Sequence, residues 1–428
     1  MSRRHFMRHL AATSLAIPAL QWTRAIQANA AELKRQGKSC VLLWMSGGPA
    51  TIDIWDLKPG AETGGEFSPI STSVPGIQIS EHMPNVAKQM NHLAIVRSMA
   101  TTEADHGRGT YKMHTGYVPT VTMQHPSFGA VTAYELGQKM EDFALPHFIS
   151  VGGGGLGSGA GFLGMAHAPF HIAGAGSAIQ NIQPPGGLAQ FRIENRVAIQ
   201  KLMDEQFLKD GHGLAAKDHK EVYEKTLRMM SALAELRAEK RDPFSLEHED
   251  KATKERYGEN GFGKGCLLAR RLVEAGITFV EVGLGGWDTH NNTFEAHKNR
   301  LQPELDKGMA ALVGDLADRG LLENILIVWM GEFGRTPNIN QNTGRDHWAR
   351  SWSVVMGGCG IKGGQVIGKT NEDGREVAER PLDTPDLMAT FYKALGIKQD
   401  TQYTTPNGRP YWVVDKDTGA QPIAELFS

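Results

Sequence analysis

Three short segments in the C-terminal half of the chain place carboxylates and imidazoles close together. They are residues 285–290 (GGWDTH), 331–337 (GEFGRTP) and 344–348 (GRDHW). The first two each follow an apolar run of β type, and α/β folds keep their ligand sites where strands give way to loops. Carboxylate oxygen and imidazole nitrogen are ligands that divalent ions prefer. The three segments together therefore predict one metal-centred site assembled from several loops.

The predicted ligands share a position just after a strand or in a loop beside one. Asp288 and His290 are two residues apart, which in an extended loop puts both side chains on the same side. An acid just past the first strand is also well placed for a metal. The predicted metal ligands are Asp53, Asp288, His290, Glu332, Asp346 and His347. The expected cofactor is one or two divalent ions, with Zn, Mn and Ca left open.

Residues 105–116 (DHGRGTYKMHTG) form a further segment dense in functional groups. His106 could act as nucleophile, general base or metal ligand. Arg108 could bind an oxyanion, and His114 is expected to help bind substrate. A helix that begins near His106 would favour an anion at its N-terminal amides. Arg335 is predicted to be catalytic, since an arginine beside a metal carboxylate either pairs with it or binds the substrate anion.

The elements that position these residues alternate between strands and helices. Continuous apolar runs predict buried strands at residues 40–45, 92–99, 147–151, 277–282, 324–330 and 352–356. Helical periodicity covers residues 128–140, 194–208, 215–241, 263–275, 293–319 and 384–395. This alternation predicts an α/β fold, a three-layer α/β/α sandwich with a mostly parallel sheet. The polar block at about 188–260 is predicted to be a helical insertion on the same domain, which would span residues 31–428.

The N-terminus has the pattern of an export signal. Residues 2–7 (SRRHFM) are cationic, residues 10–20 are moderately apolar, and residues 28–30 (ANA) offer a signal-peptidase site. This pattern predicts a twin-arginine signal peptide over residues 1–30, recognition by the twin-arginine export machinery, and a periplasmic or extracellular protein.

The charge and composition of the chain argue against nucleic acid as a partner and against a transmembrane segment. Removing residues 1–30, which hold four arginines and no acid, leaves 41 of the 45 basic residues against 47 acids, a net charge of −6. Such a chain is not expected to bind nucleic acid. No mature segment approaches the ~20 apolar residues of a transmembrane helix. The three cysteines are far apart in sequence and imply no disulfide.

The motifs, taken together with the export signal, resemble a family of secreted twin-arginine proteins, the domain-of-unknown-function family 1501. The resemblance runs from Val41 to the C-terminus and rests on residues 47–49 (GGP) with Asp53 and on the three segments above. This family is a distant branch of the alkaline phosphatase and sulfatase superfamily. The resemblance implies an alkaline phosphatase-like fold and a metal-dependent hydrolase of phosphate or sulfate esters, with a small-molecule or carbohydrate ester as substrate.

Positions carried over from the superfamily also show departures. His106 occupies the place of the sulfatase nucleophile, where the superfamily has Cys or Ser, and Glu332-Phe333 stands where an Asp-His pair is usual. Asp288 and His290 resemble the ligand pair after a late strand, and His347 resembles the final histidine ligand. The missing Ser or Cys keeps a second hypothesis open, in which the chain is a catalytically degenerate member that acts as an exported binding or assembly protein.

Overall fold

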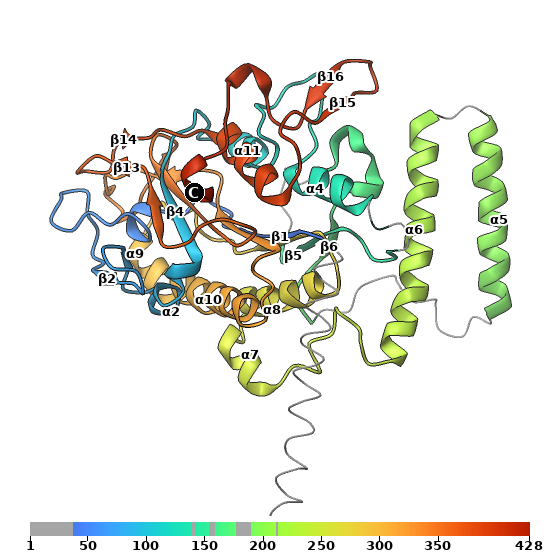
Figure 1. Ribbon diagram of the computed structural model, residues 1–428, viewed down its shortest axis with the longest axis horizontal. Coiled ribbons are helices and arrows are strands. Elements are labelled where there is room, and N and C mark those ends of the chain that lie inside the picture. The colour runs from blue at the N-terminus through green and yellow to red at the C-terminus, as the bar shows by residue number, and fades with distance from the viewer. Residues whose placement is uncertain (1–36, 139, 141–142, 154–158, 177–189, 211–212) are drawn as a thin grey trace, which may run out of the picture.

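The computed structural model describes residues 37–428 except 139, 141–142, 154–158, 177–189 and 211–212 (Figure 1). The predicted signal peptide, residues 1–30, lies outside the described residues. A central eight-stranded sheet has the order β12-β4-β11-β8-β1-β7-β5-β6. Its strands, in that order, are Gln365–Ile367, Leu93–Met99, Trp352–Gly357, Ile325–Met330, Ser39–Trp44, Phe279–Gly283, Phe148–Val151 and Phe170–Ile172.

The sheet is mostly parallel, as predicted. β1 pairs in parallel with β7 and β8, β5 with β6 and β7, and β12 with β4. β11 is the exception and runs antiparallel to both β4 and β8. Consequently β1, β4, β7 and β8 all end at the edge of the sheet where β11 begins, and the loops at this edge meet.

Helices cover both faces of the sheet. Val41 and Leu43 of β1 pack into one core cluster with α8 (Gly261–Glu274) and α10 (Gln302–Asp318). The alternate residues Leu42 and Trp44 pack into a second cluster on the other face, beneath α3 (His106–Thr115), α4 (Phe128–Gly137) and α11 (Thr384–Leu395). A strand buried on both faces reads as an unbroken apolar run because successive side chains point to opposite layers.

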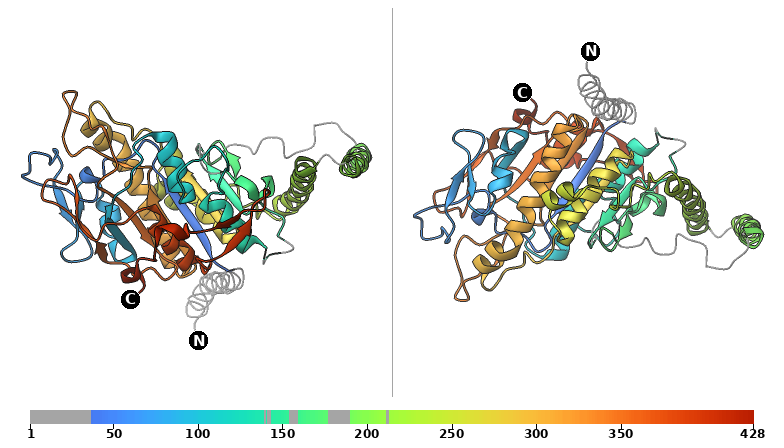
Figure 2. Two further views of the ribbon diagram at one scale, coloured as in Figure 1. Left: turned by 90° about the horizontal axis from the view of Figure 1, so that it is seen from above. Right: turned by 90° about the horizontal axis from the view of Figure 1, so that it is seen from below.

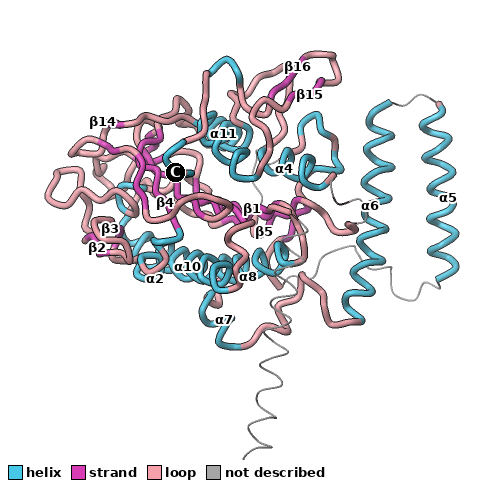
Figure 3. The backbone as a smooth tube through the Cα atoms, in the orientation of Figure 1, coloured by secondary structure: helices cyan, strands magenta, loops and turns pink. Residues whose placement is uncertain are grey.

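The views from above and below show the same layering, with α8 and α10 side by side on one face (Figure 2). Strands lie between two groups of helices (Figure 3). The structure therefore confirms the predicted three-layer α/β/α class. Smaller two-stranded sheets pair β2 (Pro69–Ser71) with β3 (Gln78–Ser80), β9 (Gly334–Arg335) with β10 (His347–Trp348), β13 (Lys369–Thr370) with β14 (Val377–Glu379), and β15 (Gln402–Thr404) with β16 (Pro410–Trp412).

The predicted helical insertion contains α5 (Gln190–Lys209), α6 (Gly213–Ala238) and α7 (Lys251–Tyr257). α5 and α6 contact each other and extend away from the sheet (Figure 1). Within the described residues no helix is both long and apolar enough to cross a membrane.

One local prediction needs correction. Residues 293–319 were expected to be one helix. They form α9 (Thr293–Ala296), a π-helical turn (His297–Leu301) and α10 in direct succession. Pro303 lies just after the π-helical turn and has no N–H to donate, and the N–H of Gln302 before it bonds five residues back to the carbonyl of His297. All three cysteines are buried and free.

Candidate metal centre

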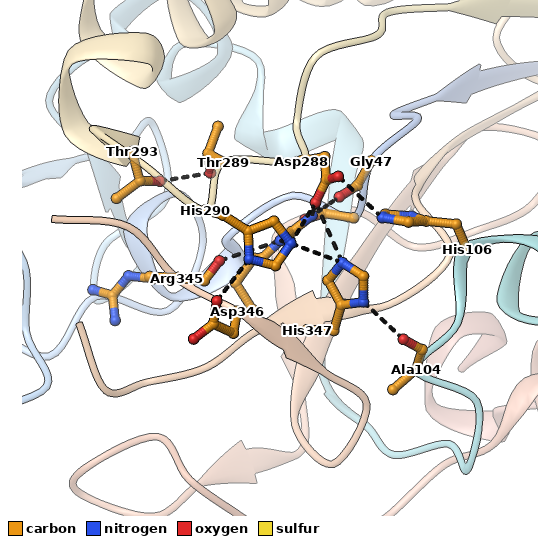
Figure 4. A network of polar contacts seen from close by, with 12 residues as sticks. Gly47, Ala104, His106, Asp288, Thr289, His290, Thr293, Arg345, Asp346 and His347 are labelled. Carbon is orange, nitrogen blue, oxygen red and sulfur yellow. Dashed lines mark hydrogen bonds and ion pairs between the residues drawn. The ribbon is translucent and has the colours of Figure 1, made fainter. Parts of the chain in front are cut away.

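The candidate site lies at the edge where β1, β4, β7 and β8 end (Figure 4). The loop after β7 carries Asp288 and His290, and the segment between β4 and the start of α3 leads to His106. His347 lies in β10, directly opposite Arg335 of β9. Four segments that are separate in the sequence therefore meet in a single cluster. Each of them contributes one or two side chains with an imidazole, carboxylate or guanidinium group.

Asp288 is the residue that these groups share. Its Oδ1 lies 3.0 Å from Nε2 of His290 and 3.3 Å from Nε2 of His347, while its Oδ2 lies 3.3 Å from Nε2 of His106. The Nε2 atoms of His290 and His347 are 3.1 Å apart. Ligand atoms of His106, Asp288 and His347 all fall within 4.8 Å of one another. One carboxylate oxygen of Asp288 therefore faces His290 and His347, and the other faces His106.

Each of the three imidazoles is oriented by an oxygen atom at its other nitrogen. Nδ1 of His106 lies 2.7 Å from Oε1 of Glu332, and Nδ1 of His290 lies 2.6 Å from Oδ1 of Asp346. Nδ1 of His347 lies 2.8 Å from the carbonyl oxygen of Ala104. A carbonyl oxygen only accepts hydrogen bonds, and ionised carboxylates do the same. The neutral rings therefore carry their protons on Nδ1 and turn the Nε2 lone pairs inward.

This arrangement fits a divalent ion. Two Nε2 lone pairs 3.1 Å apart repel each other unless a cation or proton lies between them. Tetrahedral bonds of ~2.0–2.1 Å place neighbouring ligand atoms about 3.3–3.4 Å apart, close to the separations among Asp288, His290 and His347. Metal-bound histidines also normally donate Nδ1–H to a carboxylate or carbonyl, the pattern found here. Asp288, His290, His347 and His106 would hold the ion or ions.

The charges of the site follow from these contacts. Burial opposes ionisation of Asp288, but the hydrogen bond and charge of Arg335 outweigh it and hold the pKa of that carboxyl at about 2. The hydrogen bond to Glu332 raises the pKa of His106. Partial burial lowers the pKa of His347. The hydrogen bond to His290 lowers the pKa of Asp346.

Gly47 joins the end of β1 to this cluster. Its φ of +116° is in the region that favours glycine, and a Cβ there would lie 2.4 Å from the backbone nitrogen of Asp288. Its N–H donates to Oε1 of Glu332 at 2.9 Å, and its carbonyl accepts from Arg335. A side chain at position 47 would therefore displace the loop that carries Asp288.

Three of the six predicted ligands converge as expected, and three occupy other places. Glu332 and Asp346 contact the outer nitrogens of His106 and His290, so they orient ligands rather than face the shared point. Asp53 lies apart: both its oxygens accept from the buried guanidinium of Arg345, each at 2.7 Å. Conversely His106, which the sequence left open among several roles, belongs to the cluster.

The predicted substrate-binding residues are also placed differently from expectation. His114 is almost fully buried, with Nδ1 2.8 Å from the carbonyl of Thr110 and Nε2 3.3 Å from Glu281, so a substrate cannot reach it. Arg108 pairs with Glu103 at 2.7 and 2.8 Å through two nitrogens. Its predicted role as an anion binder has no support in this geometry, because its guanidinium is already neutralised.

Arg335 takes the first of the two roles that the sequence left open. Its buried guanidinium donates to Asp288 and to the carbonyl oxygens of Gly47 and Gly48. Nη1 also lies 3.3 Å from Nε2 of His290. Arg335 therefore fixes the Asp288 carboxylate within the loops, and the prediction that it holds a substrate anion is not supported.

Solved structures with related architecture share little sequence with this chain. A structure of Ps i-CgsB in complex with k-i-k-neocarrahexaose gives a TM-score of 0.41 at 11% identity and covers 91% of this chain and 75% of its own. The PsFucS1 sulfatase from Pseudoalteromonas sp. gives 0.36 at 13%, with 88% and 72% covered. The phosphonate monoester hydrolase from Silicibacter pomeroyi gives 0.39 at 10%, with 91% and 76% covered.

The comparison with curated protein sequences found no match. A family model does match, and it covers residues 37–427, nearly the whole of the described chain. Its description is "Protein of unknown function (DUF1501)", the family that the sequence motifs resemble. The chain therefore belongs to the DUF1501 family.

Proposed function

We propose that the protein is an exported, metal-dependent hydrolase of phosphate or sulfate esters, including esters of carbohydrates. The observation that carries this proposal is the inward orientation of three Nε2 atoms around Asp288, each ring fixed by an acceptor at Nδ1. Such a donor set suits Zn and Mn better than Ca, because calcium prefers oxygen ligands.

A divalent ion held by these residues would supply Lewis acidity toward an ester oxygen and favour ionised water at neutral pH. The chain's own contribution centres on His106. Glu332 holds the Nδ1 proton, which leaves the Nε2 lone pair directed at Asp288. Nε2 itself is buried and has no hydrogen-bond partner, so its lone pair is left for a metal ion or for a reacting atom that enters beside Asp288. Where Asp288, His290 and His347 hold the ion without His106, Nε2 can take a proton as a general base or serve as a nucleophile.

In the nucleophilic route, Nε2 forms a bond to phosphorus while the phosphorus–oxygen bond to the alcohol breaks. The alcohol oxygen leaves with the bonding electrons and takes up a proton from solvent. A water molecule then attacks phosphorus, its oxygen becomes part of the released phosphate, and Nε2 of His106 regains its lone pair. His106 begins α3, whose N-terminal amides favour the negative charge of the transferred group.

The test is turnover by the mature chain, residues 31–428, loaded separately with Zn, Mn or Ca. Substrates are p-nitrophenyl phosphate, p-nitrophenyl sulfate, a phosphonate monoester and a sulfated monosaccharide. We expect turnover in at least one case, reduced about 100-fold or more by His106→Ala, with His219→Ala as a control outside the cluster. Metal-replete protein without turnover on any of these esters would reject the hydrolase. An acid-labile phosphoryl group on His106 would identify the nucleophilic route.

A second candidate is an exported binding or assembly protein. The observation that favours it is the burial of Arg335, whose donors are committed to Asp288, Gly47 and Gly48 rather than to a substrate anion. Full metal occupancy combined with no turnover is the outcome expected from this candidate.

The support for export is the N-terminal sequence pattern. We propose that the twin-arginine machinery carries the folded chain across the membrane, which suits a protein that takes up its metal before export. The double variant Arg3→Lys/Arg4→Lys is expected to stay in the cytoplasm, and cell fractionation measures where it accumulates.

A further inference from the structure

Helix α5 carries large apolar side chains on the face that α6 does not cover. Ile199, Leu202 and Met203 are 57%, 67% and 62% exposed, and Phe191 is 60% exposed at the start of the helix. Scattered apolar residues are ordinary on a surface, but a contiguous patch of them marks an interaction site. Both overall views show α5 as the outermost element, beyond α6 (Figures 1 and 2).

The inner face of α5 is already occupied. Val197, Gln200, Asp204 and Leu208 are partly buried and recur at intervals of three or four residues, which is one side of a helix. Asp204 also lies 3.7 Å from His219 of α6. The exposed residues 199 and 202 project from the opposite side, since each residue turns the helix by about 100°. α5 therefore exposes apolar side chains on the side opposite the one that meets α6.

The outward stripe has the spacing of a helix-pairing seam. Asn195, Ile199, Leu202 and Gln206 follow one another at intervals of four, three and four residues, which is the repeat of core positions in paired helices. Apolar residues occupy the middle of this seam and amides occupy its two ends. The helix is about 30 Å long, given 20 residues at ~1.5 Å each.

Two copies of this seam match each other when the helices run antiparallel. In an antiparallel pair with its two-fold axis near residues 200 and 201, Ile199 meets Leu202 of the other copy and Asn195 meets Gln206. Arg192 at one end then faces Asp210 at the other, so opposite charges meet. Antiparallel packing also opposes the two helix dipoles favourably.

We infer that α5 is a dimerisation surface for a second copy of this chain, paired antiparallel so that two α5–α6 hairpins form a four-helix bundle. Such a contact is isologous and closes at two copies. A membrane surface is a poorer occupant: α5 holds four basic residues against three acids, and a net charge of +1 is far from the cationic cluster that anionic lipid requires. This inference is independent of the proposed hydrolase.

The first experiment measures the mass of the full mature chain by sedimentation velocity from about 1 to 100 μM. We expect a dimer that Ile199→Asp/Leu202→Asp converts to a monomer, with helix content and bound metal unchanged. Lys201→Asp, which places the same charge at an adjacent exposed position, should remain dimeric. A monomeric wild type, or a double variant that stays dimeric, would overturn the inference. So would a monomer that co-sediments with anionic vesicles.

Two single-cysteine variants test the direction of pairing. Asn195→Cys mixed with Gln206→Cys should form a disulfide-linked heterodimer, whereas neither variant alone should cross-link, because residue 195 meets 206 and not itself. The natural cysteines are buried and will not compete. Cross-linking by either variant alone would reject the antiparallel register.

Discussion

Nδ1 of His106 lies 2.7 Å from Oε1 of Glu332, and the same oxygen accepts the N–H of Gly47 at 2.9 Å. A single carboxylate oxygen therefore connects the start of α3, the end of β1 and the loop after β8. The corresponding acceptors for His290 and His347 are Asp346 and a backbone carbonyl. The outer contacts, as much as the inward-facing atoms, define where a metal would bind.

Replacing Glu332 by Gln should weaken metal binding without abolishing it. The amide preserves size but removes the charge that orients His106, and changes at such outer partners typically cost about 10–100-fold in metal affinity. Competition against a fluorescent chelator measures the affinity. Glu372→Gln, in an exposed loop, is the matched control. An unchanged affinity would mean that His106 contributes nothing to the site.

Removing two inward-facing residues should abolish metal binding. Asp288→Ala/His347→Ala takes away the shared carboxylate and one imidazole, so elemental analysis should find one or two equivalents of metal in the wild type and close to none in the variant. His219→Ala should keep the wild-type content. A metal-free wild type that gains no stability from Zn, Mn or Ca would contradict the metal centre itself.

Asp53→Ala should destabilise the fold while leaving metal content unchanged. The substitution leaves the buried guanidinium of Arg345 without its carboxylate partner. Breaking a buried ion pair in this way costs about 3–5 kcal/mol in free energy of unfolding. Urea denaturation measures this loss. Asp53→Leu/Arg345→Met should recover most of it, because both charges are then absent. If the single variant lost metal but not stability, Asp53 would have to be a ligand after all.

His297 should make stability fall in acid. Burial, together with the charges of Arg345 and Arg335, lowers its pKa to about 3 in the folded state, against ~6.5 when unfolded. Between these values the unfolded chain binds a proton that the folded chain does not. The contribution of His297 is therefore complete above about pH 6.5 and is lost toward pH 3, at up to about 1.4 kcal/mol per pH unit.

The variant His297→Gln isolates this effect. Its destabilisation relative to wild type should be greatest near pH 7.5 and should shrink as the pH falls to about 4.5, because the wild type alone loses the stability due to a neutral buried imidazole. Denaturation at a series of pH values measures the difference. The exposed His219→Gln serves as control, and a difference that does not vary with pH would refute the assignment.

Much of the fold could be predicted because its central strands are buried on both faces. The run at residues 40–45 predicted β1 (Ser39–Trp44), and residues 324–330 predicted β8 (Ile325–Met330), within one residue at each end. The edge strands β6 and β12 were missed, since they are three residues long and carry no continuous apolar pattern. The antiparallel direction of β11 depends on its partners, which a single segment does not encode.

The candidate site was predictable only in part. The pairs Asp288/His290 and Asp346/His347 could be found because each lies in one short loop. Which member faces the shared point depends on contacts between loops: Glu332 meets His106 across 226 positions of sequence, and Asp53 meets Arg345 across 292. The pairing of Asp53 with a buried arginine leaves no local pattern in the sequence, so its place outside the cluster could not be predicted.

The distance in sequence between His106 and His347 has a consequence for how the protein matures. His347 is made after α3, the insertion and most of the sheet, so a growing chain has no complete centre until β10 has left the ribosome. A chain truncated before residue 347 would lack this ligand however well its earlier strands had paired. Bound metal would therefore show that synthesis has passed β10, although β11, β12 and α11 are made later still.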